Sequence, residues 1–173
     1  MRLRRSIGLL ALVIVVPAIA GAQEQADRGA TVADSCAATP VLGDLPVGIR
    51  ATSGEFPVWM RDNGGGRWAG GEAKVSTLWM VLRRLHGDLV VTGRRLDGPG
   101  HARFQREFQN ATDSLVIAAA DRQGVNPGTV SPRTMRQFSF HPSYVIYPAP
   151  GCWELTARFD TSVVTMVLLQ RQP

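Results

Sequence analysis

The fold is decided by residues 151–170, which read GCWELTARFDTSVVTMVLLQ. From Trp153 to Phe159 every second residue is apolar, and the residues between them are polar or charged. This alternation predicts a strand with one face on a core and the other facing solvent. Asp160-Thr161 then supplies a short turn, and the largely apolar run Val163–Leu169 returns as a partner strand. We therefore expect the chain to end in an antiparallel hairpin.

The rest of the chain has a similar β-rich rhythm. From Cys36 onward, Gly and Pro recur at short intervals, with short β-forming runs between them. That spacing predicts an all-β sandwich or barrel. Further short strands and a glycine-rich turn are expected, the strands at Leu45–Ala51, Pro57–Arg61 and Tyr144–Tyr147 and the turn at Asp62–Gly66.

A second hairpin is predicted in the middle of the chain. Its strands are Val75–Leu82 and Leu89–Leu96, and His86-Gly87-Asp88 is the turn between them. Both faces of the first strand are largely apolar, which is typical of a strand buried inside a fold. Such a hairpin places Arg83-Arg84 and Arg94-Arg95 near one another.

Residues 101–140 carry mixed signals. Phe104 and Phe108 have the i, i+4 spacing of a helix face, whereas Leu115–Ile117 is typical of a strand. Asn126-Pro127-Gly128 and Ser131-Pro132 predict a long loop, and long loops in compact domains are often functional. This segment is either a functional loop or a set of additional strands.

Residues 1–22 read as a secretory signal peptide. A positive start containing Arg4 and Arg5 precedes the apolar run Ile7–Val16, and small residues follow in an Ala-x-Ala pattern before Gln23. The apolar run is too short for a membrane anchor. We expect cleavage before Gln23, a flexible lead-in at residues 23–35, a single sandwich domain at residues 36–173, and a secreted or periplasmic location.

Export changes how the charge is interpreted. The 173-residue chain has a net charge of +5, and cleavage removes three arginines and no acid, so the mature chain carries +2. Lys74 is the single lysine, and arginines supply the remaining basic residues. Nucleic-acid binding needs cations clustered with aromatic residues on one face, and this pattern is absent from the sequence. We expect no nucleic-acid partner and no stable membrane anchor after cleavage.

The cysteines predict one disulfide. Cys36 and Cys152 are the two cysteines of an exported chain, and neither has the C-x-x-C or Cys/His neighbours of a redox or metal site. Because Cys152 precedes the inward Trp153, the bridge should tie the N-terminal segment to an edge or outer face of a sheet. The immunoglobulin bridge, in contrast, crosses the core between two sheets.

Two segments resemble a known group of proteins. Residues 87–98 read GDLVVTGRRLDG, and residues 148–156 read PAPGCWELT. Together with Cys36, they resemble a loose group of uncharacterised secreted or lipoprotein bacterial proteins, in which a G-R-R-L-D-G hairpin precedes a P-x-P-G-C-W strand. The resemblance implies an immunoglobulin-like antiparallel β-sandwich with one disulfide. It implies no activity and no catalytic residue, and the stretch between Ala102 and His141 departs from the group's pattern.

The sequence contains no recognisable catalytic constellation. His86, His101 and His141 are not spaced like metal ligands, and no G-x-S-x-G turn, phosphate-binding loop or dinucleotide motif is present. Ser139, His141 and Ser143 are close in sequence, but they lack an acid and an oxyanion hole. We expect no catalytic residues, no metal and no cofactor. The alternative is a secreted hydrolase or metal-dependent enzyme whose acids and histidines are assembled by the fold.

Two tryptophans are the candidate ligand surface. Trp59 and Trp68 flank the glycine-rich turn, where exposed rings would bind a protein or a polysaccharide. Buried sheet positions explain the same two residues equally well. We expect a non-catalytic binding module or an envelope-associated structural module. A protein inhibitor or assembly domain that uses residues 101–140 as its contact loop is a third possibility, and the oligomeric state stays open.

Overall fold

The computed structural model describes residues 36–44, 50–51, 53–55, 57–63, 66–121, 124, 128 and 130–172. The predicted signal peptide and lead-in lie outside these residues, as do residues 45–49 of the expected strand Leu45–Ala51. None of the helices among the described residues is long and apolar enough to cross a membrane.

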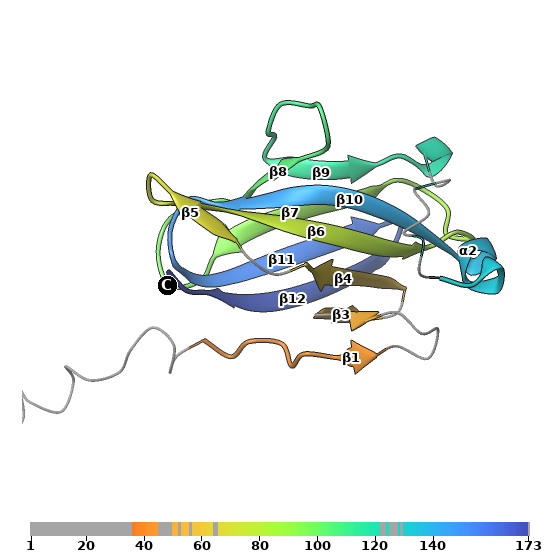
Figure 1. Ribbon diagram of the computed structural model, residues 1–173, viewed down its shortest axis with the longest axis horizontal. Helices are drawn as coiled ribbons and strands as arrows, with labels where there is room; N and C mark the ends of the chain where they lie inside the picture. The colour runs from red at the N-terminus through yellow and green to blue at the C-terminus, as the bar shows by residue number, and fades with distance from the viewer. Residues whose placement is uncertain are drawn as a thin grey trace, which may run out of the picture. The chain divides into compact units, whose positions relative to one another are not determined.

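The described residues form two large antiparallel sheets (Figure 1). The six-stranded sheet has the order β3 (Ser53–Glu55), β4 (Val58–Asp62), β6 (Glu72–Leu82), β10 (Phe138–Tyr147) and β8 (Arg103–Gln105), with β5 (Arg67–Ala69) also paired to β6. The four-stranded sheet has the order β12 (Ser162–Gln170), β11 (Gly151–Phe159), β7 (Leu89–Arg95) and β9 (Ser114–Ile117). A short separate pair joins β1 (Gly43–Asp44) to β2 (Arg50–Ala51), and two short helices are η1 (Ala119–Asp121) and α2 (Pro132–Gln137).

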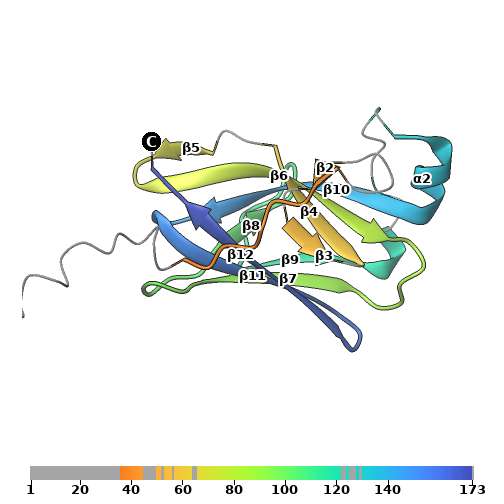
Figure 2. The ribbon, with the colours of Figure 1, turned by 90° about the horizontal axis from the view of Figure 1, so that it is seen from below.

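The main core lies between the two large sheets. Figure 2 shows β6 and β10 in one layer and β7 and β11 in the other. Alternate residues of each strand point inward, and Trp79 of β6 and Trp153 of β11 are both fully buried there. The predicted fold class, an all-β antiparallel sandwich with one disulfide, is confirmed.

A second core covers the outer face of the six-stranded sheet. Met80 and Leu82 of β6 and Phe140 of β10 are buried there, and Met135 of α2 packs against them. The helix starts at Ser131, whose side chain accepts a hydrogen bond from the backbone N–H of Thr134, as an N-cap residue does. These two cores explain why both faces of β6 are apolar.

The C-terminal hairpin forms as predicted. β11 and β12 pair in register from Gly151–Gln170 to Phe159–Ser162, and Asp160-Thr161 is the turn. Asp160 has a φ of 47°, a left-handed conformation that Asp tolerates better than most residues. Trp153, Leu155, Ala157 and Phe159 are all buried, as their alternation predicts.

The prediction of a hairpin at 75–96 is wrong. β6 and β7 are strands, but β6 pairs with β4, β5 and β10, whereas β7 pairs with β11 and β9. The connection between them crosses from one sheet to the other. The four arginines therefore do not meet, because Arg83-Arg84 precede this crossing and Arg94-Arg95 lie at the far end of β7.

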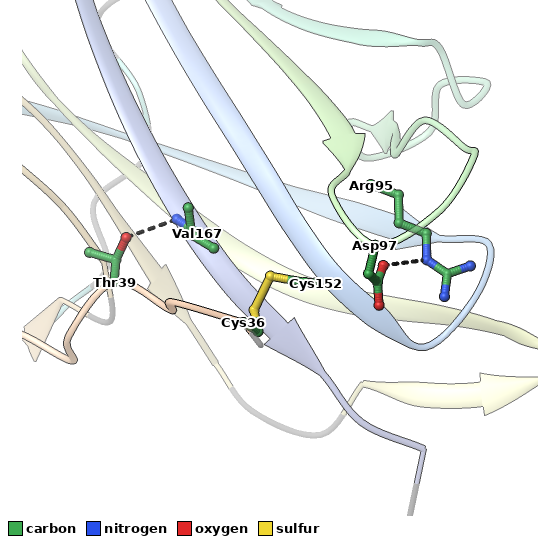
Figure 3. Close-up of a disulfide and its surroundings, with 6 residues drawn as sticks. All are labelled: Cys36, Thr39, Arg95, Asp97, Cys152 and Val167. Carbon is green, nitrogen blue, oxygen red and sulfur yellow. Dashed lines mark hydrogen bonds and ion pairs between the residues drawn. A yellow bond between two sulfur atoms is a disulfide. The ribbon is translucent and has the colours of Figure 1, made fainter. Parts of the chain in front are cut away.

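The disulfide joins Cys36 to Cys152 as predicted (Figure 3). The N-terminal segment then runs along β12: the backbone N–H of Thr39 donates to the carbonyl of Val167, and the N–H of Val167 donates to the hydroxyl of Thr39, each at 2.8 Å. β12 is the edge strand of its sheet, and this segment hydrogen-bonds to the edge that does not pair with β11. Without such a segment, an edge strand exposes unpaired backbone groups.

Acidic and basic side chains pack beside the bridge. Nε of Arg95 donates to a carboxylate oxygen of Asp97 at 2.7 Å, and the backbone N–H of Leu96 donates to the carbonyl of Cys152. Gly151 lies directly under the Arg95–Asp97 pair. We call this group, Cys36, Arg95, Asp97, Gly151 and Cys152, the disulfide corner.

Candidate functional site

Trp59 and Trp68 lie on opposite faces of the six-stranded sheet. Trp59 is opposite Met80 of the second core and makes an edge contact with the ring of Phe138, with ring centroids 5.7 Å apart. Trp68 is opposite Ala73 of the main core, and its Nε1 donates to the carbonyl of Arg171 at 2.9 Å. Both rings are half-buried. The structure does not bring these two residues together in one ligand surface.

The three histidines are also separate. His86 is exposed in the connection between β6 and β7, His101 is exposed beside Arg94, and His141 is buried on β10. Among the described residues, no group of three or more His, Cys, Asp or Glu side chains lies close enough to hold a metal ion.

The serines and the histidine of β10 form a buried polar cluster with β6. Nε2 of His141 lies 2.9 Å from Oγ of Ser139, and Nε1 of Trp79 donates to Oγ of Ser143 at 2.9 Å. Oγ of Ser143 also lies 2.9 Å from Oγ1 of Thr77. Ser139 has no exposed surface, and its hydroxyl donates to the carbonyl of Val81. A substrate carbonyl cannot reach Ser139 there, and its hydroxyl, like that of Ser143, is hydrogen-bonded to a buried polar group.

β8 and the residues that follow it form a tightly held loop, residues 103–112, that we call the Phe108 loop. Phe104 and Thr112 exchange two backbone hydrogen bonds, of 2.7 and 2.8 Å, which close the base of the loop. At its tip, the N–H of Gln109 donates to the carbonyl of Arg106. The expected helix face of Phe104 and Phe108 is wrong, because Phe104 is buried in β8 and Phe108 lies at the loop tip.

Phe108 has two unusual properties. Its φ is 61°, in the left-handed region where an ordinary side chain costs about 1–2 kcal/mol. It is the third residue of the Arg106–Gln109 turn, a position at which positive φ favours Gly or Asn. Its side chain is 98% exposed, so contacts inside the fold do not compensate for this strain.

Two clefts flank the Phe108 loop. One, of about 440 Å³, is lined by Arg106, Glu107 and Gln109 together with Asp121 and His141. The other, of about 230 Å³, lies along Phe104, Thr112 and Leu115 and also contacts Arg106. The loop tip is therefore a projecting aromatic ring with charged residues of both signs beside it.

An ion pair joins the Phe108 loop to η1. The guanidinium of Arg106 lies 3.3 Å from the carboxylate of Asp121, the last residue of η1. Both side chains are partly exposed, so this pair contributes little to stability and mainly restricts the position of the loop relative to η1.

No protein-family model, curated protein or solved structure matches the chain. The candidate site is therefore defined by the structure of this chain alone.

Sequence reasoning missed Phe108 as a site residue. Its spacing from Phe104 suggested a helix, which hid the fact that the two rings point to different environments. The available signal was a lone aromatic in an otherwise polar run, Gln105–Asn110. The sequence pattern does not predict the positive φ of Phe108, because Phe seldom adopts that conformation.

Proposed function

We propose that this protein is an exported, non-catalytic binding module that docks a folded protein partner through the Phe108 loop. The observation that carries the proposal is a Phe side chain that is 98% exposed on a left-handed backbone. Burying a Phe side chain contributes about 1.5–3 kcal/mol. In the free protein the ring is not buried and this free energy is not gained. A partner that covers the ring would gain it on binding.

The disulfide supports the exported location. Bridges of this kind persist in oxidising compartments outside the cytoplasm, and Cys36 and Cys152 are paired in the fold. The signal-peptide pattern of residues 1–22 agrees with the same location.

The shape of the loop favours a protein over a polysaccharide as the partner. Phe108 projects from a tight turn, and a projecting ring is complementary to a pocket, which a folded protein offers and a sugar chain does not. Arg106 and Glu107 beside it carry opposite charges and suit the polar rim of a protein interface. Aromatic anchors that fill such pockets dominate binding energies.

Site-specific cross-linking tests this proposal. Replacing Phe108 with p-benzoylphenylalanine in the producing cells should give a light-dependent adduct with one protein. The matched control is the same replacement at Val163, a 49% exposed residue of β12, which should not give that adduct. In addition, Phe108→Ala should weaken binding to the purified partner by about 30-fold or more.

Two outcomes would count against the proposal. Identical adducts from positions 108 and 163 would show that the loop has no special role. Adducts with glycan alone from position 108 would support a polysaccharide-binding module instead.

A further inference from the structure

An arginine-lined cleft lies where β6 and α2 end. Its volume is about 510 Å³, and its lining consists of Leu82, Arg83, Arg84, Arg136 and Gln137. The cleft shares no lining residue with the two clefts beside the Phe108 loop.

Hydrogen bonds of Arg83 tie the end of β6 to the end of α2. The N–H of Arg83 donates to the carbonyl of Gln137 at 2.8 Å, and Nε of Arg83 donates to the carbonyl of Phe138 at 2.9 Å. The turn after β6 is closed by a hydrogen bond from the N–H of Leu85 to the carbonyl of Leu82. The end of β6 and the end of α2 are thus tied together, and Arg84 and Arg136 belong to the two sides of this junction.

Arg84 and Arg136 supply the positive charge of the cleft that a ligand can reach. In the part of the chain that the structure describes, no ion pair joins Arg84 or Arg136 to an acidic side chain. Both side chains are exposed, and Arg133 of α2, also exposed, adds a further positive charge nearby. Arginines elsewhere in the fold do have acidic partners, such as Arg94 with Glu154 and Arg103 with Glu72.

We infer that this cleft binds a phosphate group of an anionic ligand. A carboxylate has one charge and two oxygens, which a single guanidinium fork can satisfy. Arg84 and Arg136 present two exposed guanidinium groups at one cleft, and together they match a ligand with more charge and more acceptor oxygens, as in a phosphomonoester or a diphosphate. The ligand is either a soluble phosphorylated compound or the headgroup of a phospholipid, and both present the same phosphate chemistry.

Calorimetric titration with pyrophosphate tests the inference for a soluble ligand. The wild-type protein should bind it, more weakly at higher salt. Arg84→Gln and Arg136→Gln should each weaken binding by about tenfold or more, because each removes charge-assisted hydrogen bonds. Both residues are exposed, so both variants should keep the wild-type unfolding temperature. The control is Arg67→Gln, which removes one exposed arginine at the opposite end of β6 and should leave binding within about twofold.

Vesicles distinguish the two sources of phosphate. The second probe is phosphatidylcholine vesicles that contain phosphatidic acid. A lipid headgroup is the ligand if the wild-type protein binds these vesicles but not pyrophosphate, and if the Arg84 and Arg136 variants lose the vesicle binding. Absence of binding to both probes would overturn the inference. So would equal losses in Arg67→Gln, or equally tight binding of tricarballylate, which carries carboxylates in place of phosphate.

Discussion

The disulfide corner and the Phe108 loop use their side chains in opposite ways. In the disulfide corner, Cys152 is buried and Asp97 is mostly buried and paired with Arg95. In the Phe108 loop, hydrogen bonds also close the backbone, but the side chain of Phe108 at the tip is 98% exposed at a strained φ. Substitutions in the first region should therefore lower stability, whereas those at the tip of the second should change binding without lowering stability.

The largest effect is expected at the bridge. Replacing both Cys36 and Cys152 with Ser opens a connection between residues 116 positions apart, and the chain-entropy model assigns about 4–5 kcal/mol to a loop of that size. Urea unfolding measures this loss. Amide exchange should also accelerate at Thr39 and Val167, whose mutual hydrogen bonds depend on the tethered segment. The reduced wild-type protein is the control, and an unchanged midpoint in the double variant would show that the bridge does not stabilise this corner.

The next effect is expected at Gly151. Its φ is 150°, and an added Cβ would lie 2.7 Å from both Nε of Arg95 and a carboxylate oxygen of Asp97. Gly151→Ala should therefore lose about 2–3 kcal/mol, because it combines backbone strain with disruption of the ion pair. Gly70→Ala is the matched control, since Gly70 has a φ of 60° but open space around it, and about 1 kcal/mol is expected there. Equal losses at the two positions would mean that the Arg95–Asp97 pair simply moves aside.

A smaller, pH-dependent effect is expected at Asp97. Burial raises the pKa of this carboxyl, but hydrogen bonds from Arg95 and the backbone at Cys152, together with the charge of Arg95, hold the pKa below its ordinary value. The folded state therefore favours the carboxylate, and its stabilisation is present above about pH 4 and is lost as the pH falls through the lower folded pKa.

The substitution Asp97→Asn measures that contribution. At neutral pH the variant should be less stable than wild type by about 1–2 kcal/mol, and the difference should narrow below about pH 4. The control is Asp113→Asn at an exposed position. A difference that stays constant from neutral to acid pH would show that the carboxylate charge is not what stabilises the corner.

The smallest effect, with the opposite sign, is expected at Phe108. Phe108→Gly relieves the left-handed strain, which raises stability, and increases the chain entropy of the unfolded state, which offsets part of that gain. The net stability should rise by about 0.5–1 kcal/mol. Partner binding should be lost in the same variant. Phe104→Ala supplies the contrast, because Phe104 is 1% exposed and its loss should destabilise the fold. A Phe108→Gly variant that is clearly less stable than wild type would place Phe108 among the structural residues.

The contrast between the two hairpins predicted from the sequence shows where local reasoning succeeds. The β11–β12 hairpin was predictable because its alternation, its two-residue turn and its pairing all involve adjacent residues. β6 and β7 have equally clear strand patterns, but their pairing was predicted wrongly. A connection of six residues is long enough to cross between sheets, and each strand's own pattern does not say which sheet it joins.

The candidate sites were less predictable than the fold. Trp59 and Trp68 lie on either side of one turn in the sequence, but the sheet places them on opposite faces. Arg84 and Arg136 are more than fifty positions apart in the sequence and line one cleft only because the ends of β6 and α2 meet.

The sequence by itself determined the β class, the C-terminal hairpin and the cysteine pairing, because alternation and a count of two cysteines do not depend on distant neighbours. Only the tertiary structure decided which strands share a sheet, why β6 is apolar on both faces, and that Phe108 is exposed at its loop tip while Phe104 is buried. The physical reason is that the burial of a side chain and the strain of its backbone depend on how distant parts of the chain pack together. The same side chain stabilises a core or anchors a partner according to which surfaces the fold brings against it.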